Sequence, residues 1–371
     1  MGDGIANSRY VSGVGTNQLG NMLAAAYACG IRGINAEDAY AAARKNELDG
    51  TDRPLGAGKV DTDKFLKYGY VPHLDKGTGP DEAWMFSASH TLEYSFGAYA
   101  VAQMAKALGK TDDYNRLMDL SKGWERIYDT KLNLIHPCTA DGKFIDGFKP
   151  MQVWRGFQEG NAFQYTFYVP HDPKGLIAKM GNKEFTERLD SIFTWSESKI
   201  FSGGTTIDAF AGLQTYYNQG NQPCLHISWL FNLSGAPSLT QKWVRTILDK
   251  FYGTDGIHGY GYGQDEDQGQ LGAWYVISSM GIFDVAGLCN INPKCSLGSP
   301  KFNRITIQLH PDYYKGREFV IEAPGNSDTN KYAQKYTLNG RVITDLNLPF
   351  SAVTSGGKLV VEMGDTPKNK Y

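Results

Sequence analysis

Two short segments of the chain place carboxylates among glycine, amide and aromatic side chains. Trp154–Tyr165 reads WRGFQEGNAFQY and contains Glu159, and Asp265–Gln270 reads DEDQGQ. Carboxylates in such surroundings are suited to a neutral, hydroxyl-rich substrate rather than to ion pairing. Acid-assisted cleavage of a glycosidic bond needs two of them, one to protonate the leaving oxygen and one to activate water. Because the segments are far apart in the sequence, the fold must bring them together.

Glu159 is the candidate proton donor. Aromatic residues flank it at positions Trp154, Phe157, Phe163 and Tyr165. Desolvation by aromatic rings raises the pKa of a carboxyl, as a general acid working near neutral pH requires. The alternative is a loop glutamate that faces water, which is the usual position of a single Glu. Arg155 is the one basic residue in this segment, which favours the catalytic interpretation.

The acidic tripeptide Asp265–Asp267 precedes a predicted helix, where the helix dipole favours negative charge. Three adjacent carboxylates also repel one another, so a bound cation or a catalytic role is the stronger explanation. Either Asp265 or Asp267 could activate water, and the other could help to bind a hard metal ion through oxygen. The glycines of the preceding Gly259–Gly263 segment give the backbone freedom to approach a ligand closely.

A third polar loop, Tyr217–Pro223, reads YNQGNQP. Its amide oxygens suit Ca²⁺, and amide groups bind sugar hydroxyls both as donors and as acceptors. Taken alone, an ordinary capping loop is the simpler interpretation.

Composition excludes several classes of protein. The 371 residues include 37 Lys and Arg against 39 Asp and Glu, a net charge of −2. This balance predicts no nucleic-acid partner and no basic membrane-binding patch. No apolar stretch has transmembrane length, and we expect no signal peptide within this chain. Of the five cysteines, Cys289 and Cys295 could form a local disulfide or remain buried thiols.

The pattern of apolar residues predicts a mainly α-helical protein with a smaller β-rich C-terminal region. We expect a catalytic domain over residues 1–285 and a β-rich region over residues 286–371. The expected helices are Asn17–Cys29, Ala36–Arg44, Thr91–Leu108, Asp113–Tyr128, Lys183–Phe193, Leu225–Asn232, Ser238–Phe251 and Gln268–Met280. The expected strands are Ile305–Leu309, Phe319–Glu322 and Leu359–Glu362. We expect Ser238 to be the N-cap of its helix and Asn339-Gly340 to form a turn.

Several motifs in register resemble one known family over nearly the whole chain. They are Thr91–Tyr94, Glu159–Tyr165, Val169–Asp172, Gly220–Pro223, Asp265–Gln270, Ala273–Tyr275, Gly298–Pro300, Thr337–Gly340 and Met363–Gly364. Together they resemble the catalytic region of glycoside hydrolase family 92, the calcium-dependent exo-acting α-mannosidases. The resemblance implies an (α/α)6 toroid, inversion at the anomeric carbon, and a Ca²⁺ ion that helps to distort the mannose ring through its 2- and 3-hydroxyls.

The resemblance also implies roles for residues. Glu159 corresponds to the general acid, and the general base falls on the acidic tripeptide, with Asp267 as first choice and Asp265 as second. The residues we expect near calcium are Asn161, Gln164, Asn221 and Asp265. The residues we expect to bind substrate are Glu93, Trp154, Gln158, Asn161, Gln164, Tyr165 and Gln222.

The sequence departs from the family pattern in two places. Relatives carry an N-terminal β-sandwich domain before the part that this chain matches, so we expect such a domain, and export from the cytoplasm, in the full-length parent. The segment Ser95–Ala98 stands where relatives usually have acidic residues.

The expected function is that of an inverting, calcium-dependent exo-α-mannosidase acting on mannose-capped glycans, with α-1,2 linkages as the candidate specificity. The alternative is a truncated or non-catalytic glycan-binding protein.

Overall fold

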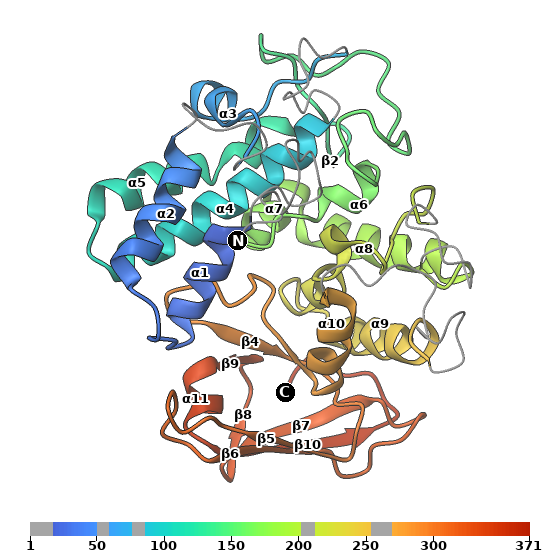
Figure 1. Cartoon of the computed structure of the whole chain (residues 1–371). Coiled ribbons are helices and arrows are strands. Elements are labelled where there is room, and N and C mark those ends of the chain that lie inside the picture. The colour runs from blue at the N-terminus through green and yellow to red at the C-terminus, as the bar shows by residue number, and fades with distance from the viewer. Residues whose placement is uncertain (1–17, 50–58, 76–85, 202–211, 254–268) are drawn as a thin grey trace. The chain divides into compact units, whose positions relative to one another are not determined.

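The computed structural model describes residues 18–49, 59–75, 86–201, 212–253 and 269–371. The chain divides into two compact units (Figure 1). Unit 1 comprises Met1–Asp172 with Ala286–Ile291, and unit 2 comprises Pro173–Val285 with Asn292–Tyr371.

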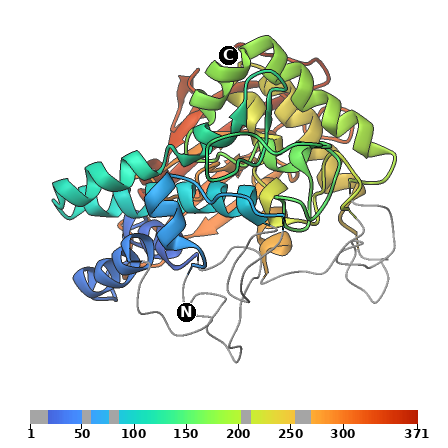
Figure 2. The same ribbon diagram turned by 90° about the horizontal axis from the view of Figure 1, so that it is seen from above.

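Unit 1 is built around one long buried helix. Its helices are α1 (Leu19–Ala28), α2 (Ala36–Leu48), α3 (Thr62–Tyr68), α4 (Ser87–Ala107), α5 (Thr111–Leu120), the 3₁₀ helix η2 (Gly123–Ile127) and α6 (Ala162–Thr166). Strands β1 (Tyr128–Asp129) and β2 (Leu134–Ile135) form an antiparallel pair. Helix α4 contacts α1, α2, α5 and η2, and both views show α1, α2 and α5 gathered around it (Figures 1 and 2).

Burial of α4 matches its central position. Seventeen of its 21 residues are buried, so it has no continuous exposed face. The buried residues include polar ones such as Ser89, His90 and Glu93 as well as apolar ones. The small side chains of Ala98, Ala102 and Ala105 are fully buried in the core cluster that α1, α2 and α5 share with α4. Small residues let helices approach closely, and the resulting density of contacts stabilises the unit.

A buried ion pair lies against α4. The Nζ atom of Lys59 is 2.5 Å from Oε1 and 2.6 Å from Oε2 of Glu47, and the two side chains are only 4% and 3% exposed. A Cβ atom added to Gly97 would collide with Lys59 and come within 3.1 Å of Glu47 Oε1. Gly97 therefore leaves room for a carboxylate supplied by α2.

Unit 2 combines helices with the β-rich C-terminal part. Its helical elements are α7 (Pro173–Met180), α8 (Asn182–Glu197), the 3₁₀ helices η3 (Gln222–Cys224) and η4 (Ile227–Asn232), α9 (Pro237–Lys250), α10 (Gln270–Ser279) and α11 (Phe350–Thr354). Its strands are β3 (Ile282–Phe283), β4 (Lys294–Leu297), β5 (Arg304–Gln308), β6 (Glu318–Glu322), β7 (Tyr332–Leu338), β8 (Arg341–Ile343), β9 (Asn347–Pro349) and β10 (Gly357–Gly364).

The strands of unit 2 form two sheets within the described residues. One has the order β5-β6-β10-β7-β8, with β10 parallel to β6 and the other neighbours antiparallel. The other has the order β3-β4-β9. The turn between β7 and β8 is Asn339-Gly340, with φ angles of 48° and 80°. Two successive positive φ angles match the right-handed twist of a two-residue hairpin, which confirms the predicted turn.

Helix α9 is tied to the β-rich part by two buried polar side chains. Gln241 accepts a hydrogen bond from Ala333 N at 2.8 Å and donates to the hydroxyl of Tyr371 at 2.7 Å. Arg245 is 1% exposed and donates to Pro300 O and Asn326 Oδ1, both at 2.9 Å. These bonds satisfy polar groups that would destabilise the core if they were left unpaired.

Most of the predicted elements are confirmed, but some details were wrong. Ser238 is not an N-cap, because α9 begins at Pro237 after Ala236, and a proline is favourable in the first helical turn. The predicted helix Leu225–Asn232 is a 3₁₀ helix over most of its length, and Asp113–Tyr128 is divided into α5 and η2. The short helices α3, α6, α7 and α11 were not predicted.

The helix-rich chain with a β-rich C-terminal part is confirmed, whereas the (α/α)6 toroid and the division at residue 285 stay predictions. All five cysteines are free thiols. In the parts of the chain that the structure describes, no helix combines the length and the apolar character needed to cross a membrane.

Candidate active site

The loop that carries Glu159 has an unusual backbone. Trp154 and Glu159 have φ angles of 66° and 51°, and Gly156 between them has a φ angle of 94°. Positive φ is uncommon for residues other than glycine and rare for a bulky one such as Trp. Strained conformations of this kind persist when the surroundings hold them, and they cluster at functional sites.

Neighbouring helices hold this loop at three backbone atoms. The first amides of α4, Ala88 N and Ser89 N, donate to Gly156 O at 3.0 and 3.1 Å. The hydroxyl oxygen of Ser89 accepts from Gln158 N at 2.9 Å. The phenol of Tyr165 on α6 donates to Gln158 O at 2.6 Å. Both peptide groups of Gln158 are thereby fixed, and Glu159 is the next residue.

Glu159 is half-buried, and two aromatic residues of the same segment are fully buried. Phe157 and Tyr165 are 0% exposed, and their ring centroids are 5.6 Å apart. Burial raises the pKa of Tyr165 well above its usual range, the Glu93 carboxylate raises it further, the Ser89 hydroxyl opposes the rise, and Glu159 adds to it. Two carboxylates, one from α4 and one from the loop, therefore lie within electrostatic reach of one phenol.

Arg155, the basic residue of the segment, binds elsewhere. Its Nε and Nη2 atoms lie 3.2 and 3.1 Å from Asp75 Oδ1, and its Nη1 donates to Gly147 O at 3.3 Å. These contacts direct the guanidinium to Asp75. The neutral and aromatic surroundings expected for the Glu159 carboxyl stay a prediction.

Asn161 has a structural task that sequence reasoning did not identify. It is the N-cap of α6, and its Oδ1 accepts from Phe163 N at 3.0 Å and Gln164 N at 3.3 Å. A carbonyl oxygen has two lone pairs, so this atom is fully engaged by the cap. Gly160 is equally constrained, because an added Cβ would lie 2.7 Å from Gln164 Oε1 and 2.9 Å from Tyr165 Cε2.

Two further predicted substrate residues are buried in unit 1. Glu93 and Gln158 are each 5% exposed. His90, one turn before Glu93, stacks on Tyr94 with ring centroids 5.4 Å apart. Burial lowers the pKa of His90 to about 4, against the opposing effect of the Gln158 side chain beside it. His90 is therefore a neutral ring near pH 7.

The aromatic residue Trp154 is less buried than these and lies near α4. Its ring centroid is 5.9 Å from that of Phe86, at an interplanar angle of 55°. Unit 1 thus brings together Glu93, Trp154, Gln158, Glu159, Asn161, Gln164 and Tyr165.

The remaining predicted site residues belong to unit 2 or lie outside the described residues. Asn221 is 5% exposed and precedes η3, which begins at Gln222. Asn218, three residues earlier, accepts from Gly220 N at 3.0 Å in an Asx turn, and the side chain of Asn221 makes no capping hydrogen bond to η3. Asp265 and Asp267, with the glycine-rich Gly259–Gly263, lie outside the described residues, and their roles stay predictions.

The predicted calcium ligands stay predictions. The Oδ1 atom of Asn161 is taken by the helix cap, and Asp265 is outside the described residues. Over the ranges that the structure covers, no three His, Cys, Asp or Glu side chains gather as a metal site. Ca²⁺ also binds amide and backbone carbonyl oxygens and water, so the roles of Asn161, Gln164, Asn221 and Asp265 near calcium stay predictions.

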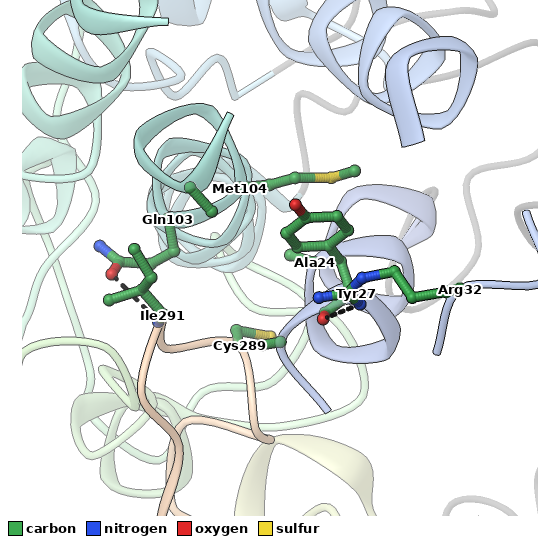
Figure 3. A pocket seen from close by; sticks show the side chains of 9 residues that line it. Ala24, Tyr27, Arg32, Gln103, Met104, Cys289 and Ile291 are labelled. Carbon is green, nitrogen blue, oxygen red and sulfur yellow. Dashed lines mark hydrogen bonds between the residues drawn. The ribbon is translucent and has the colours of Figure 1, made fainter. Parts of the chain in front are cut away.

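A hollow of about 200 Å³ opens elsewhere in unit 1. It lies between α1 and α4, and the segment containing Cys289 and Ile291 closes one side (Figure 3). The guanidinium of Arg32 stacks over the Tyr27 ring at 4.1 Å. None of the predicted site residues lines this hollow, so it is distinct from the Glu159 loop.

Comparison with known proteins identifies the family to which the chain belongs. The model of the family described as "Glycosyl hydrolase family 92 catalytic domain" matches residues 2–365. A solved structure of the family GH92 α-mannosidase BT3965 from Bacteroides thetaiotaomicron is 28% identical, with a TM-score of 0.79, over 95% of this chain and 42% of that one. The inverting mannosidase BT2199 from Bacteroides thetaiotaomicron VPI-5482 is 29% identical, with a TM-score of 0.78, over 95% and 46%.

A curated relative, described as an uncharacterized secreted glycosidase of Arthroderma benhamiae, is 26% identical over 333 residues, which are 80% of this chain and 38% of that protein. The fold resembles that of the family 92 α-mannosidases of known structure. The chain is a member of glycosyl hydrolase family 92 and contains its catalytic domain. It spans less than half the length of the relatives it matches.

Proposed function

We propose that this chain is the catalytic part of an exo-acting α-mannosidase that releases terminal mannose with inversion. The observation that supports the proposal is the Glu159 loop, whose half-buried glutamate lies within electrostatic reach of the buried Tyr165 in a member of family 92. The solved relatives are described as α-mannosidases, and one of them as inverting. Mannose-capped glycans are the proposed substrates, with α-1,2 linkages as the first choice.

In this proposal Glu159 protonates the glycosidic oxygen while Asp267 deprotonates water on the opposite face of the sugar. Asp265 is the second candidate for the base. Inverting glycosidases leave room for water between their two carboxyls, about 6.5–9.5 Å apart. Bound Ca²⁺ would supply positive charge that orients and distorts the sugar. Its protein ligands would have to come largely from residues other than Asn161, whose side-chain oxygen caps α6.

The parent protein is proposed to act outside the cytoplasm and to contain an N-terminal β-sandwich domain. The description of the fungal relative as secreted supports the first part. The (α/α)6 toroid remains the proposed architecture of the catalytic domain.

The proposal is tested by incubating the 371-residue chain with α-1,2-, α-1,3- and α-1,6-mannobiose and measuring released mannose. Release from α-1,2-mannobiose in preference to the others is expected. Release from none, by a chain that is folded by circular dichroism, would contradict the proposal.

A second candidate function is non-catalytic glycan binding. Calorimetric binding of mannobiose without release of mannose would support this alternative.

A further inference from the structure

Glu159, the proposed general acid, has a backbone conformation that its surroundings must stabilise. Glu159 has a φ angle of 51°, in the left-handed region. This region costs an L-residue other than glycine roughly 1–2 kcal/mol. An unsupported loop would leave it for more favourable angles, and the carboxyl would then point elsewhere. A general acid must lie within hydrogen-bond reach of the leaving oxygen, so something must hold this backbone.

The support comes from two hydroxyl groups that bind the backbone N–H and the backbone carbonyl of Gln158. The Ser89 oxygen accepts from Gln158 N at 2.9 Å, and the Tyr165 phenol donates to Gln158 O at 2.6 Å. Ser89 is 1% exposed and Tyr165 is 0% exposed. Both bonds are thus shielded from water. In the protein interior a hydrogen bond is electrostatically stronger than in solvent.

Both hydroxyls stand on helices rather than on loops. Ser89 lies in the first turn of α4, whose amides also bind Gly156 O, and Tyr165 lies on α6, which is capped by Asn161. Groups held by packed helices are positioned more rigidly than groups on loops. Gly160 permits the close approach of Tyr165, because any Cβ there would press against its ring.

We propose that Tyr165 and Ser89 are positioning residues that orient the general acid by fixing the two peptide groups of Gln158. The proposal deepens the proposed function and rests on it. It also assigns Tyr165 a role other than direct contact with substrate, because its hydroxyl is buried and bonded to Gln158 O.

The test compares two variants with matched controls. Tyr165→Phe and Ser89→Ala each remove one of the two hydroxyls that bind the backbone of Gln158. Tyr70→Phe removes another 2.6 Å phenol bond to a backbone carbonyl, that of Thr139, in the same unit. Ser95→Ala removes another α4 hydroxyl that accepts a backbone N–H, that of Trp124 at 3.1 Å.

Each variant is assayed on α-1,2-mannobiose and on an aryl α-mannoside whose leaving group needs no acid. A misplaced catalytic group lowers the rate by about a hundredfold. We therefore expect Tyr165→Phe and Ser89→Ala to lower kcat on mannobiose by about tenfold to a hundredfold, and to lower kcat on the aryl mannoside much less. Tyr70→Phe and Ser95→Ala should lower both to the same small extent, if at all.

A pH profile supplies a second measurement. The alkaline limb of kcat reports the group that must be protonated. In Tyr165→Phe the fall of kcat at alkaline pH should become smaller or shift to another pH. In Tyr70→Phe it should coincide with that of the unsubstituted chain. Equal losses of kcat on both substrates, with an unchanged profile, would overturn the positioning role. Ser89→Ala serves as the independent variant if Tyr165→Phe does not fold.

Glu159→Gln, assayed on the same two substrates, separates this proposal from the proposed function. If Glu159→Gln loses the same fraction of kcat on mannobiose and on the aryl mannoside, the acid assignment itself fails. If Glu159→Gln loses more on mannobiose, but Tyr165→Phe and Ser89→Ala do not, only the positioning role is wrong.

Discussion

Lys59 and Glu47 form an ion pair that is almost fully enclosed, with Nζ 2.5 Å from Oε1 and the side chains 4% and 3% exposed. The ring of Tyr94 lies beneath the ammonium group, with Nζ 5.0 Å from its centroid. The pair thus joins α2 to the segment before α3 across the face of α4 that contains Gly97. Removing one partner from a buried pair strands the other charge away from water, at a cost of about 3–5 kcal/mol.

Glu47→Gln is therefore predicted to destabilise the chain by about 3–5 kcal/mol, measured as the free energy of unfolding in urea. Glu37→Gln is the matched control, because Glu37 pairs with Lys110 at 3.0 Å with side chains 61% and 39% exposed. An exposed pair contributes about 0–1 kcal/mol. Equal effects of the two substitutions would show that the enclosed pair does not support α4.

Glu159→Gln is predicted to remove the proton donor and leave the fold intact. Cleavage of mannobiose should fall by about 10²–10⁴-fold, the usual contribution of general acid catalysis. Cleavage of an aryl mannoside should be largely retained. Glu184→Gln serves as the control, since Glu184 pairs with Arg188 on α8 at the surface. The measurement is kcat on both substrates, and the same loss on both would argue against the acid role.

Asn161 variants distinguish a helix cap from a calcium ligand. Asn161→Ala is predicted to destabilise the chain by about 1 kcal/mol, because two amides of α6 lose their acceptor. Asn161→Asp keeps an acceptor for Phe163 N and Gln164 N, so its free energy of unfolding should be close to that of the unsubstituted chain. If the Asn161 side chain were instead a ligand of Ca²⁺, Asp should tighten calcium binding measured by calorimetry. We expect no such gain.

Stability is predicted to fall in mild acid because of buried histidines. His90 and His171 have pKa values lowered to about 4, chiefly by burial, whereas an unfolded histidine has a pKa of about 6.5. Between these values the unfolded chain binds protons that the folded chain does not. The free energy of unfolding should therefore be constant above about pH 6.5 and decrease toward pH 4, by on the order of 3 kcal/mol for each histidine.

Urea unfolding at a series of pH values between 4 and 7 measures this loss. His171, whose Nε2 donates to Ser121 O at 2.9 Å, is the better site for a comparison because it lies away from the Glu159 loop. His171→Gln should show a shallower decline with falling pH than the parent chain. Parallel declines would mean that other groups govern the acid sensitivity.

The sequence predicted the long helices because their periodic patterns extend over several turns. It missed α6 and α7, although Asn161 and Pro173 are recognisable signals for the start of a helix, because each helix is short. It placed a standard helix at Leu225–Asn232, where the structure has a 3₁₀ helix. Periods of 3.0 and 3.6 residues cannot be separated over two turns.

The chemistry of the Glu159 segment could be predicted from residue types, but its conformation could not. Trp and Glu rarely adopt positive φ, so neither Trp154 nor Glu159 signals its own backbone geometry. The support from Ser89 depends on a contact with a residue far away in the sequence. The enclosed pair of Lys59 and Glu47 is likewise a product of packing, which no local pattern encodes.

The most direct test of the account is to follow α-1,2-mannobiose hydrolysis by proton NMR, with the chain in Ca²⁺ and then in excess chelator. The account predicts that β-mannose forms first, that chelation stops its formation, and that added Ca²⁺ restores it. Initial release of α-mannose would contradict inversion, and full activity in chelator would remove calcium from the mechanism. A folded chain that releases no mannose would contradict the central claim.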